Sequence, residues 1–178
     1  MEIEIKAKVE DKAKLRQALI RIGAKEEKNK HQIDEYYNHP SRDTRKTNEY
    51  LRLRFNNGES KGIFAYHINL SDGVNKEFEV SVDSIETFRQ ILKGLNFILL
   101  GIIDKRRTEF KFEEFKISID EVKNIDNFIE VEVDGEEAEI AAKKESCLGM
   151  LDKLGISRDK ICKKIWLCDI ATGRIKYP

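Results

Sequence analysis

The residues with the clearest chemical potential are like charges placed two positions apart within short, otherwise apolar segments. There are six such doublets: Glu2/Glu4, Lys6/Lys8, Arg52/Arg54, Glu77/Glu79, Lys105/Arg107 and Glu130/Glu132. Residues two apart in a β-strand share a face and lie about 7 Å apart, where like charges repel unless solvent or a counterion separates them. Converging acids suit a hard divalent cation, and converging Lys and Arg suit a phosphate. Together the doublets predict a site for a metal ion and a polyphosphate.

Taken singly, each doublet also fits an ordinary antiparallel sheet with one solvated polar face. A solvated face usually mixes both signs with Ser and Thr, whereas one sign repeats within each doublet of this chain. The positions between the charges are mostly apolar and are expected to form a buried face: Ile3, Ile5, Leu51, Leu53, Phe55, Phe78, Val80, Ile129, Val131 and Val133. We therefore favour a shared charged site over independent solvated faces.

The doublets belong to segments with the two-residue period of β-strands. Strands are expected at residues 2–9, 31–37, 49–56, 62–71, 76–82, 105–112, 115–122 and 128–134. Helices are expected between Asp11 and Gly23 and over residues 84–94 and 136–154. Many antiparallel strands with few helices predict an α+β fold. In it, a closed antiparallel β-barrel of about eight strands is wide enough for one small ligand, and the helices pack outside.

Composition limits the classes of protein that the chain can represent. Its 178 residues include 33 basic and 33 acidic side chains, and this balance argues against a nucleic-acid or anionic-membrane binder. The length fits a single domain, and the longest apolar run, residues 97–103, is far too short to span a membrane. With no secretion signal at its start, the chain is expected in the cytoplasm. Cys147, Cys162 and Cys168 lack the C-x-x-C spacing of a zinc site.

The opening residues 2–6, Glu-Ile-Glu-Ile-Lys, resemble the E-x-E-x-K signature of the CYTH superfamily. This superfamily, also called triphosphate tunnel metalloenzymes, groups class IV adenylyl cyclases, thiamine triphosphatases and inorganic triphosphatases. Further segments resemble the family in the expected order, at residues 32–40, 49–54, 76–79, 105–107, 119–122 and 128–132. The resemblance covers residues 1 to about 155 of a single 1–178 domain and leaves 156–178 as a divergent C-terminal segment.

The resemblance implies a charged tunnel that binds a triphosphate together with Mg²⁺ or Mn²⁺. The acids that it assigns to the metal are Glu2, Glu4, Glu130, Glu132 and Asp120, with Glu77 and Glu79 as supporting acids. The cations that it assigns to the triphosphate are Lys6, Lys8, Arg52, Arg54, Lys76, Lys105 and Arg107. No residue is assigned as the general base.

The chain departs from the family pattern in three places. His67 stands where a phosphate-facing lysine is common, and a phosphate contact and a plain strand position are equally compatible with it. Residues 123–127 replace a glycine-containing turn. Beyond Gly155 little matches the family; there, the basic residues Lys163, Lys164 and Arg174 are expected to be solvated, and Trp166 is expected to anchor the segment.

These features lead to one favoured function and several alternatives. The N-H-P-S-R-D segment at residues 38–43 resembles the cyclase branch, which implies a class IV adenylyl cyclase that converts ATP into cyclic AMP and pyrophosphate. An inorganic or nucleoside triphosphatase would use the same metals and cations. A noncatalytic protein that binds nucleotide or polyphosphate, and a sheet whose charges are merely solvated, are the other classes. A homodimer, the choice of base and the choice of metal stay open.

Overall fold

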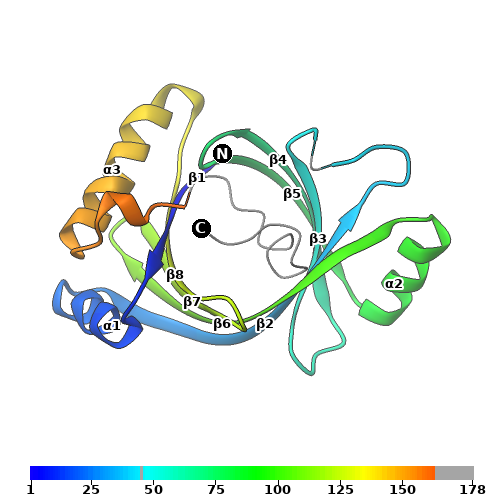
Figure 1. Cartoon of the computed structure of the whole chain (residues 1–178), viewed down its shortest axis with the longest axis horizontal. Coiled ribbons are helices and arrows are strands. Elements are labelled where there is room, and N and C mark those ends of the chain that lie inside the picture. The colour runs from blue at the N-terminus through cyan, green and yellow to red at the C-terminus, as the bar shows by residue number, and fades with distance from the viewer. Residues whose placement is uncertain (45, 163–178) are drawn as a thin grey trace. The chain divides into compact units, whose positions relative to one another are not determined.

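The computed structural model describes residues 1–44 and 46–162, in which eight strands and three α-helices occur (Figure 1). The strands are β1 (Glu2–Val9), β2 (Lys25–Asn38), β3 (Glu49–Asn56), β4 (Gly62–Ser71), β5 (Val74–Val82), β6 (Ile98–Phe112), β7 (Phe115–Val122) and β8 (Asn127–Asp134). The helices are α1 (Lys12–Arg21), α2 (Ile85–Gly94) and α3 (Ile140–Lys153), and two 3₁₀ turns cover Glu137–Glu139 and Arg158–Lys160.

All eight strands belong to one antiparallel sheet. Its hydrogen-bonded order is β1-β5-β4-β3-β2-β6-β7-β8, and β8 pairs again with β1, so the sheet closes in a ring. The fold predicted from the sequence, a closed antiparallel sheet with helices outside it, is confirmed. Within the described residues, contacts divide the chain into a first unit (1–30, 71–75 and 105–162) and a second unit (31–70 and 76–104).

α1 and α2 begin where the sequence supplies a capping side chain. Oδ1 of Asp11 accepts a hydrogen bond from the Lys14 amide at 2.9 Å, and Oγ of Ser84 accepts one from the Thr87 amide at 3.3 Å. Each bond satisfies an amide that has no partner within its helix. After α1, Gly23 adopts a positive φ of 91°, a conformation that glycine reaches at little cost.

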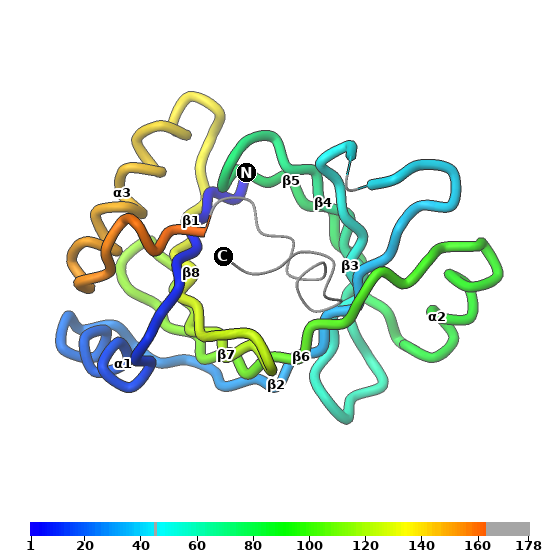
Figure 2. The backbone as a smooth tube through the Cα atoms, in the orientation of Figure 1, coloured from blue at the N-terminus to red at the C-terminus, as the bar shows by residue number. Residues whose placement is uncertain are grey.

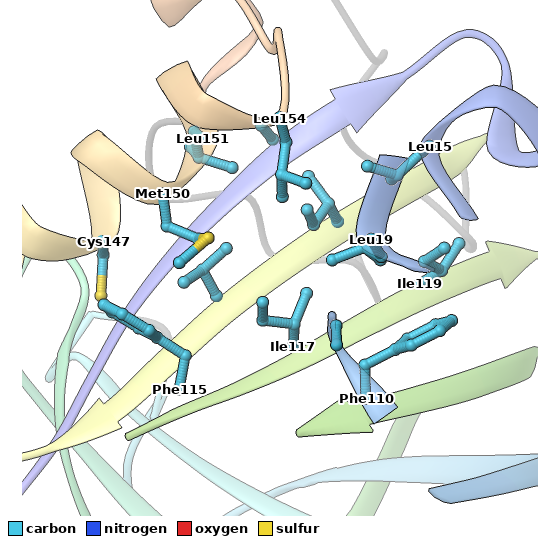
Figure 3. Packing of buried hydrophobic residues seen from close by; sticks show 14 of the residues in the cluster. Leu15, Leu19, Phe110, Phe115, Ile117, Ile119, Cys147, Met150, Leu151 and Leu154 are labelled. Carbon is cyan, nitrogen blue, oxygen red and sulfur yellow. The ribbon is translucent and has the colours of Figure 1, made fainter. Parts of the chain in front are cut away.

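The core of the first unit lies where α1 and α3 cover one face of β1, β7 and β8 (Figures 2 and 3). Leu15 and Leu19 of α1 and Leu151 of α3 are at most 3 % exposed. The strand residues that meet the helices alternate with charged ones: Ile3, Ala7, Val9, Ile117, Ile119, Ile129, Val131 and Val133. Because side chains alternate across a strand, covering this face leaves the charged residues of β1 and β8 on the opposite face.

The second unit has its own core, centred on Leu53, Val82, Ile85 and Leu92, with α2 packed on β3 and β4. The expectation that Phe78 and Val80 are buried is wrong, because their side chains are 51 % and 57 % exposed. They lie on β5, on the face opposite to that of Glu77, and neither belongs to the core beneath α2.

Two strands begin six or more residues earlier than the sequence predicted. β2 begins at Lys25 and not at residue 31, and β6 begins at Ile98 and not at residue 105. Residues 25–30 are almost all charged or polar, and residues 98–103 are almost continuously apolar, so neither stretch has the alternation that predicted the other strands. In the described part of the chain, no helix is long and apolar enough to span a membrane. Lys163, Lys164, Trp166, Cys168 and Arg174 lie outside it.

Candidate functional site

The charged face of the first unit is built by the register between β1 and β8. Glu4 stands opposite Glu132, and Lys6 stands opposite Glu130. Nζ of Lys6 lies 2.8 Å from Oε2 of Glu130, so one cross-strand position pairs opposite charges while the next places two carboxylates together. The E-x-E-x-K spacing and the E-x-E spacing of residues 130–132 therefore meet in a defined register, which the sequence alone did not specify.

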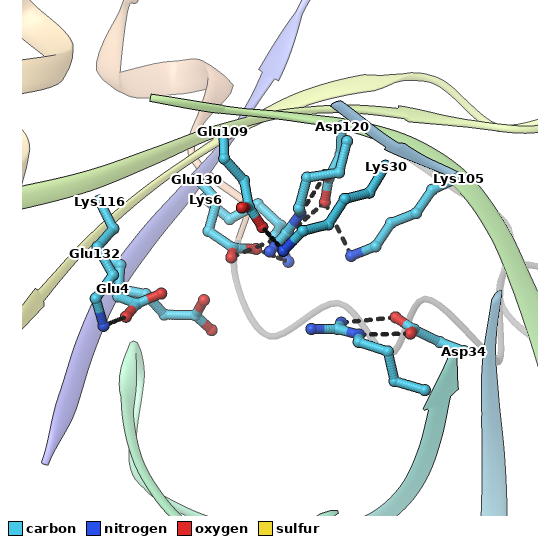
Figure 4. A network of polar contacts seen from close by, with 12 residues as sticks. Glu4, Lys6, Lys30, Asp34, Lys105, Glu109, Lys116, Asp120, Glu130 and Glu132 are labelled. Atoms are coloured by element: carbon cyan, nitrogen blue, oxygen red, sulfur yellow. Dashed lines mark hydrogen bonds and ion pairs between the residues drawn. The ribbon is translucent and has the colours of Figure 1, made fainter. Parts of the chain in front are cut away.

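Asp120 organises the cations on β6. Arg107 and Asp120 are cross-strand partners, and the guanidinium binds the carboxylate as a fork, with Nε to Oδ1 and Nη2 to Oδ2 both at 2.6 Å. Lys105 donates to the same carboxylate at 3.1 Å, and Nη2 of Arg107 also reaches Glu130 at 3.1 Å. These four side chains are at most 8 % exposed. Lys6, Lys105 and Arg107 are thus held together by two carboxylates (Figure 4).

The protonation of this cluster follows from burial and from its neighbours. Burial alone would raise the pKa of Asp120, but Arg107 and Lys105 outweigh it and lower the pKa to about 2. Burial is likewise overcome at Glu130, whose pKa lies well below its ordinary value because Arg107, Lys6 and Lys105 surround it. Burial opposes the charge on Lys6, yet Glu130 and Glu4 raise its pKa. All three groups are therefore charged near neutral pH.

Glu4 and Glu132 differ from these compensated acids. Burial raises the pKa of Glu4, and repulsion by Glu130 adds to it. Burial also raises the pKa of Glu132, with Glu130 adding repulsion, although Lys116 donates to Glu132 at 2.8 Å. Nδ2 of Asn75 donates to Glu4 at 3.1 Å. The structure thus gathers acids here with less positive charge than they require, which is the condition under which a cation binds.

The backbone of Glu4 is positioned by a close approach. Its amide donates to the carbonyl oxygen of Gly73 at 2.8 Å. Gly73 has a φ of 71°, and a Cβ at this position would lie only 2.2 Å from the carbonyl oxygen of Glu4. Only glycine fits this contact. The turn between β4 and β5 therefore fixes the position of the Glu4 backbone, from which the carboxylate extends.

A divalent cation fits some of the predicted metal acids better than others. In residues 1–44 and 46–162, no three His, Cys, Asp or Glu side chains are already arranged to hold a metal ion. Mg²⁺, however, commonly uses one or two carboxylates and takes its other ligands from water and substrate phosphates. Glu4 and Glu132 fit that donor set. Asp120 does not, because both of its oxygens are bound by Arg107 and Lys105. Asp120 instead holds these two cations in place.

The second unit contains two further ion pairs on the face away from α2. Arg54 forms a fork with Asp34, its cross-strand partner, at 2.6 and 2.7 Å. Nη2 of Arg52 donates to Oε1 of Glu77 at 2.8 Å and lies 3.8 Å from Glu79. Burial would raise the pKa of Glu77, but His67 and Arg52 outweigh it and lower the pKa to about 2. Arg52 and Arg54 are each engaged by a carboxylate.

His67 on this face is deeply buried, at 2 % exposed. Its ring stacks on Tyr50, its cross-strand neighbour, with centroids 4.1 Å apart and planes 15° apart. Nε2 lies 2.6 Å from Oε1 of Glu77, and through this contact His67 helps to lower the pKa of that carboxyl. Burial lowers the pKa of His67 to about 4, with Arg52 adding repulsion, so the ring is neutral near pH 7.

Several predicted site residues stand apart from these clusters. Lys76 is exposed, and its Nζ lies 5.1 Å from the ring centroid of Phe78, on the opposite face of β5 from Glu77. This placement does not fit the expected phosphate contact, because adjacent residues of a strand point to opposite faces. Lys8 pairs with Asp126, and Glu2 stands opposite Asp134 at the start of β1.

Sequence reasoning also missed residues that the structure adds to the clusters. Asp34 was part of a matched segment, and its role as the partner of Arg54 could have been inferred from that match. Asn75 binds Glu4 and Lys116 binds Glu132. Neither carries a local signal, because each becomes a neighbour only through strand pairing.

Comparison with known proteins adds family information to this geometry. The CYTH domain family matches residues 1–162. A Methanocaldococcus jannaschii protein named as a putative adenylate cyclase is 36 % identical over 171 residues, which is 94 % of this chain and 97 % of the relative.

Solved structures of similar fold agree with the observed topology. The Pyrococcus horikoshii protein PH1819 superposes with a TM-score of 0.86 at 25 % identity, covering 98 % of this chain and all of that one. A Hippeastrum protein described as a putative adenylyl cyclase with a dominant triphosphatase activity has a TM-score of 0.69 at 18 % identity. That superposition covers 100 % of this chain and 98 % of that one.

Proposed function

Because this chain belongs to the CYTH domain family, we propose that it is a metal-dependent enzyme acting on a triphosphate, and that its reaction converts ATP into cyclic AMP and pyrophosphate. The support for the specific reaction is the 36 % identity with a protein named as an adenylate cyclase. The support for action on a triphosphate is the buried charge cluster of the first unit.

The cluster of Lys6, Lys105, Arg107, Asp120 and Glu130 carries the proposal. Burying ions costs several kcal/mol each, and packed apolar residues of similar volume often stabilise a fold at least as well. A network of four buried charges and the half-buried Lys6 therefore calls for a reason other than stability. Fixed cations beside acids that repel one another are what a substrate with several phosphates and a divalent cation would require.

In the proposed reaction, this chain's residues bind and orient. An ammonium group has three N–H donors, so Lys6 can hold Glu130 and a phosphate oxygen together. Arg107 and Lys105, oriented by Asp120, would stabilise charge that develops on the departing pyrophosphate when the ribose 3′-hydroxyl attacks the α-phosphorus. Glu4 and Glu132 would hold a divalent cation, either Mg²⁺ or Mn²⁺, which when bound neutralises and aligns phosphoryl oxygens.

The other predicted phosphate-binding cations are judged by their chemistry and their placement. Arg52 and Arg54 are proposed to bind phosphate oxygens, because a guanidinium presents paired donors that match a phosphate. Glu77 and Glu79 would then position Arg52. Lys76 is left out, because its side chain lies on the opposite face of β5 from Glu77.

A triphosphatase is the second candidate, and the Hippeastrum neighbour described by that activity motivates it. There water attacks the terminal phosphorus and orthophosphate is released. The test is to incubate the protein with ATP, and separately with tripolyphosphate, in Mg²⁺ or Mn²⁺ and to resolve the products by phosphorus NMR and chromatography. Cyclic AMP with pyrophosphate is the expected result. Orthophosphate would establish the triphosphatase, and tight binding without product would establish a noncatalytic binder.

Glu4→Gln tests the site within the same assay. We expect turnover to fall by about 100-fold or more, because the substitution removes a carboxylate proposed to hold the cation. The folded protein should become no less stable, since Glu4 faces like charges. Glu10→Gln, at an exposed glutamate just after β1, is the matched control and should keep full activity. Full turnover by Glu4→Gln would overturn the assignment.

A further inference from the structure

Lys116 differs from the buried cations of the first unit because solvent reaches it. Its side chain is 55 % exposed, whereas Lys105 and Arg107 are 3 % and 8 % exposed. It nevertheless binds a carboxylate that is largely buried: its Nζ lies 2.8 Å from Oε1 of Glu132, whose side chain is 16 % exposed. An ion pair with an exposed member contributes little to stability and breaks at little cost. Of these three cations, Lys116 is therefore the one that can most easily leave its carboxylate.

Strand pairing places Lys116 beside the acids that are proposed to hold a divalent cation. Lys116 of β7 stands opposite Glu132 of β8, and Glu132 stands opposite Glu4 of β1. The three residues thus form one row across three strands of the first unit (Figure 4). In this row, Lys116 brings positive charge to the same carboxylate that a divalent cation would use.

A second acid offers Lys116 another partner on the same face. Asp134 lies two positions beyond Glu132 on β8, so the two side chains share a face and lie about 7 Å apart. Oδ2 of Asp134 is already 3.4 Å from Nζ of Lys116, and the Asp134 side chain is 74 % exposed. A lysine carries three N–H donors on a flexible stem. The ammonium group can therefore turn from Glu132 to Asp134 without any movement of the strands.

We propose that Lys116 is a displaceable counter-ion of the metal site, which neutralises Glu132 before a divalent cation binds and moves to Asp134 when the cation arrives. The inference rests on the proposed function, because it presupposes that Glu4 and Glu132 hold the cation. It makes Lys116 a residue that sets the affinity for the metal and not a ligand of the metal. Because the ammonium group competes with the cation for one carboxylate, the wild-type chain should bind the metal less tightly than a variant without this group.

Titration of the full-length protein with Mn²⁺ tests the competition, with the free ion measured by electron paramagnetic resonance and no triphosphate present. Lys116→Gln removes the ammonium group, and its Kd for Mn²⁺ should be about 2- to 5-fold lower than that of the wild type, as expected for the loss of an exposed ion pair. Lys116→Arg should raise the Kd, because a guanidinium can bind a carboxylate through two donors.

A neighbouring lysine provides the matched control for total charge. Lys111 of β6 stands opposite Lys116, and its Nζ donates to the backbone carbonyl oxygen of Glu114 at 3.1 Å. Lys111→Gln removes the same charge from the adjacent strand without releasing Glu132. Its Kd for Mn²⁺ should differ from that of the wild type by less than about 1.5-fold, because solvent and salt screen a more distant charge.

Thermal unfolding gives a second measure that does not depend on catalysis. Without metal, Lys116→Gln should have a lower Tm than the wild type, because Glu132 has lost its counter-ion. With saturating Mn²⁺ the two proteins should have similar Tm values, because the metal has taken the place of the ammonium group. The increase in Tm on adding Mn²⁺ should therefore be larger in the variant.

Three results would overturn the inference. An unchanged or higher Kd in Lys116→Gln would mean that Lys116 does not compete with the metal. A lower Kd in Lys116→Arg, or equal decreases in Lys116→Gln and Lys111→Gln, would mean that the ion pair with Glu132 is not what controls affinity. Failure of the metal site itself gives a different result, namely wild-type protein that binds Mn²⁺ no more tightly than Glu4→Gln does.

Discussion

The two units build the same arginine–aspartate fork and surround it differently. In each, the pair stands directly opposite on neighbouring antiparallel strands, Arg107 with Asp120 and Arg54 with Asp34, at 2.6 to 2.7 Å. In the first unit, Lys105 joins the fork and Glu130 continues it into a wider charge network. In the second unit, Arg52 on the same strand pairs with Glu77, and the imidazole of His67 lies against that same carboxylate.

This difference shows that the fork is a way of fixing an arginine, while its neighbours decide the chemistry. A charged surrounding suits phosphates and a cation, because opposite charges compensate each other where water is excluded. The second unit instead places a charged pair, Arg52 with Glu77, beside the neutral ring of His67. The same cross-strand register thus fixes an arginine in two different electrostatic surroundings.

The largest expected effect comes from removing the aspartate of each fork. Asp120→Asn leaves Arg107 and Lys105 buried without their shared counterion, so the free energy of unfolding should fall by about 3–5 kcal/mol. Asp34→Asn should cost less, because Arg54 is one cation and its side chain is 19 % exposed. Urea denaturation of both variants measures the difference. A larger loss for Asp34→Asn would mean that the two forks do not differ in the way described.

Lowering the pH is expected to have an intermediate effect on the free energy of unfolding. The pKa of His67 is lowered from 6.5 to about 4 in the folded protein, so the unfolded chain binds a proton more readily than the folded one. The associated stability is complete above pH 6.5 and is lost as the pH falls through 4, by no more than about 3 kcal/mol. His67→Phe should remove this part of the pH dependence, as seen by urea denaturation at pH 7 and pH 4.5.

A matched substitution controls for the other titrating groups in that experiment. His31→Gln replaces a histidine whose side chain is 34 % exposed, and the variant should keep the acid-dependent loss. If His67→Phe and wild type lose the same stability between the two pH values, the burial of a neutral His67 is not what makes the second unit sensitive to acid.

The smallest effect is expected at Lys76. Its side chain is exposed and lies over Phe78, so Lys76→Gln should change kcat/KM for the triphosphate less than about twofold and stability by less than about 0.5 kcal/mol. Lys105→Gln, at a lysine that is 3 % exposed, should reduce kcat/KM far more. Steady-state kinetics on both variants tests whether the face of the strand, and not the charge alone, decides which lysines matter.

Much of the fold could be predicted from local patterns. β3, β4 and β7 have the bounds that the alternation indicated, and α1 and α2 begin at the predicted Asp11 and Ser84 caps. The N-terminal part of β2 could not be predicted, because residues 25–30 carry charges on both faces and show no period of two. The exposure of Phe78 and Val80 could not be predicted for a related reason. Alternation separates the two faces of a strand but does not indicate which face a helix will cover.

By itself, the sequence determined which residues share a strand face, where helices begin, and that acids and cations recur at strand spacing, since these follow from the geometry of neighbouring residues. Only the tertiary structure decided that Glu4 faces Glu132 while Lys6 faces Glu130, that Asp120 is fully occupied by Arg107 and Lys105, and that His67 contacts both Tyr50 and Glu77. The reason is that register is a property of two strands together, and a shift by one residue would exchange every one of these neighbours.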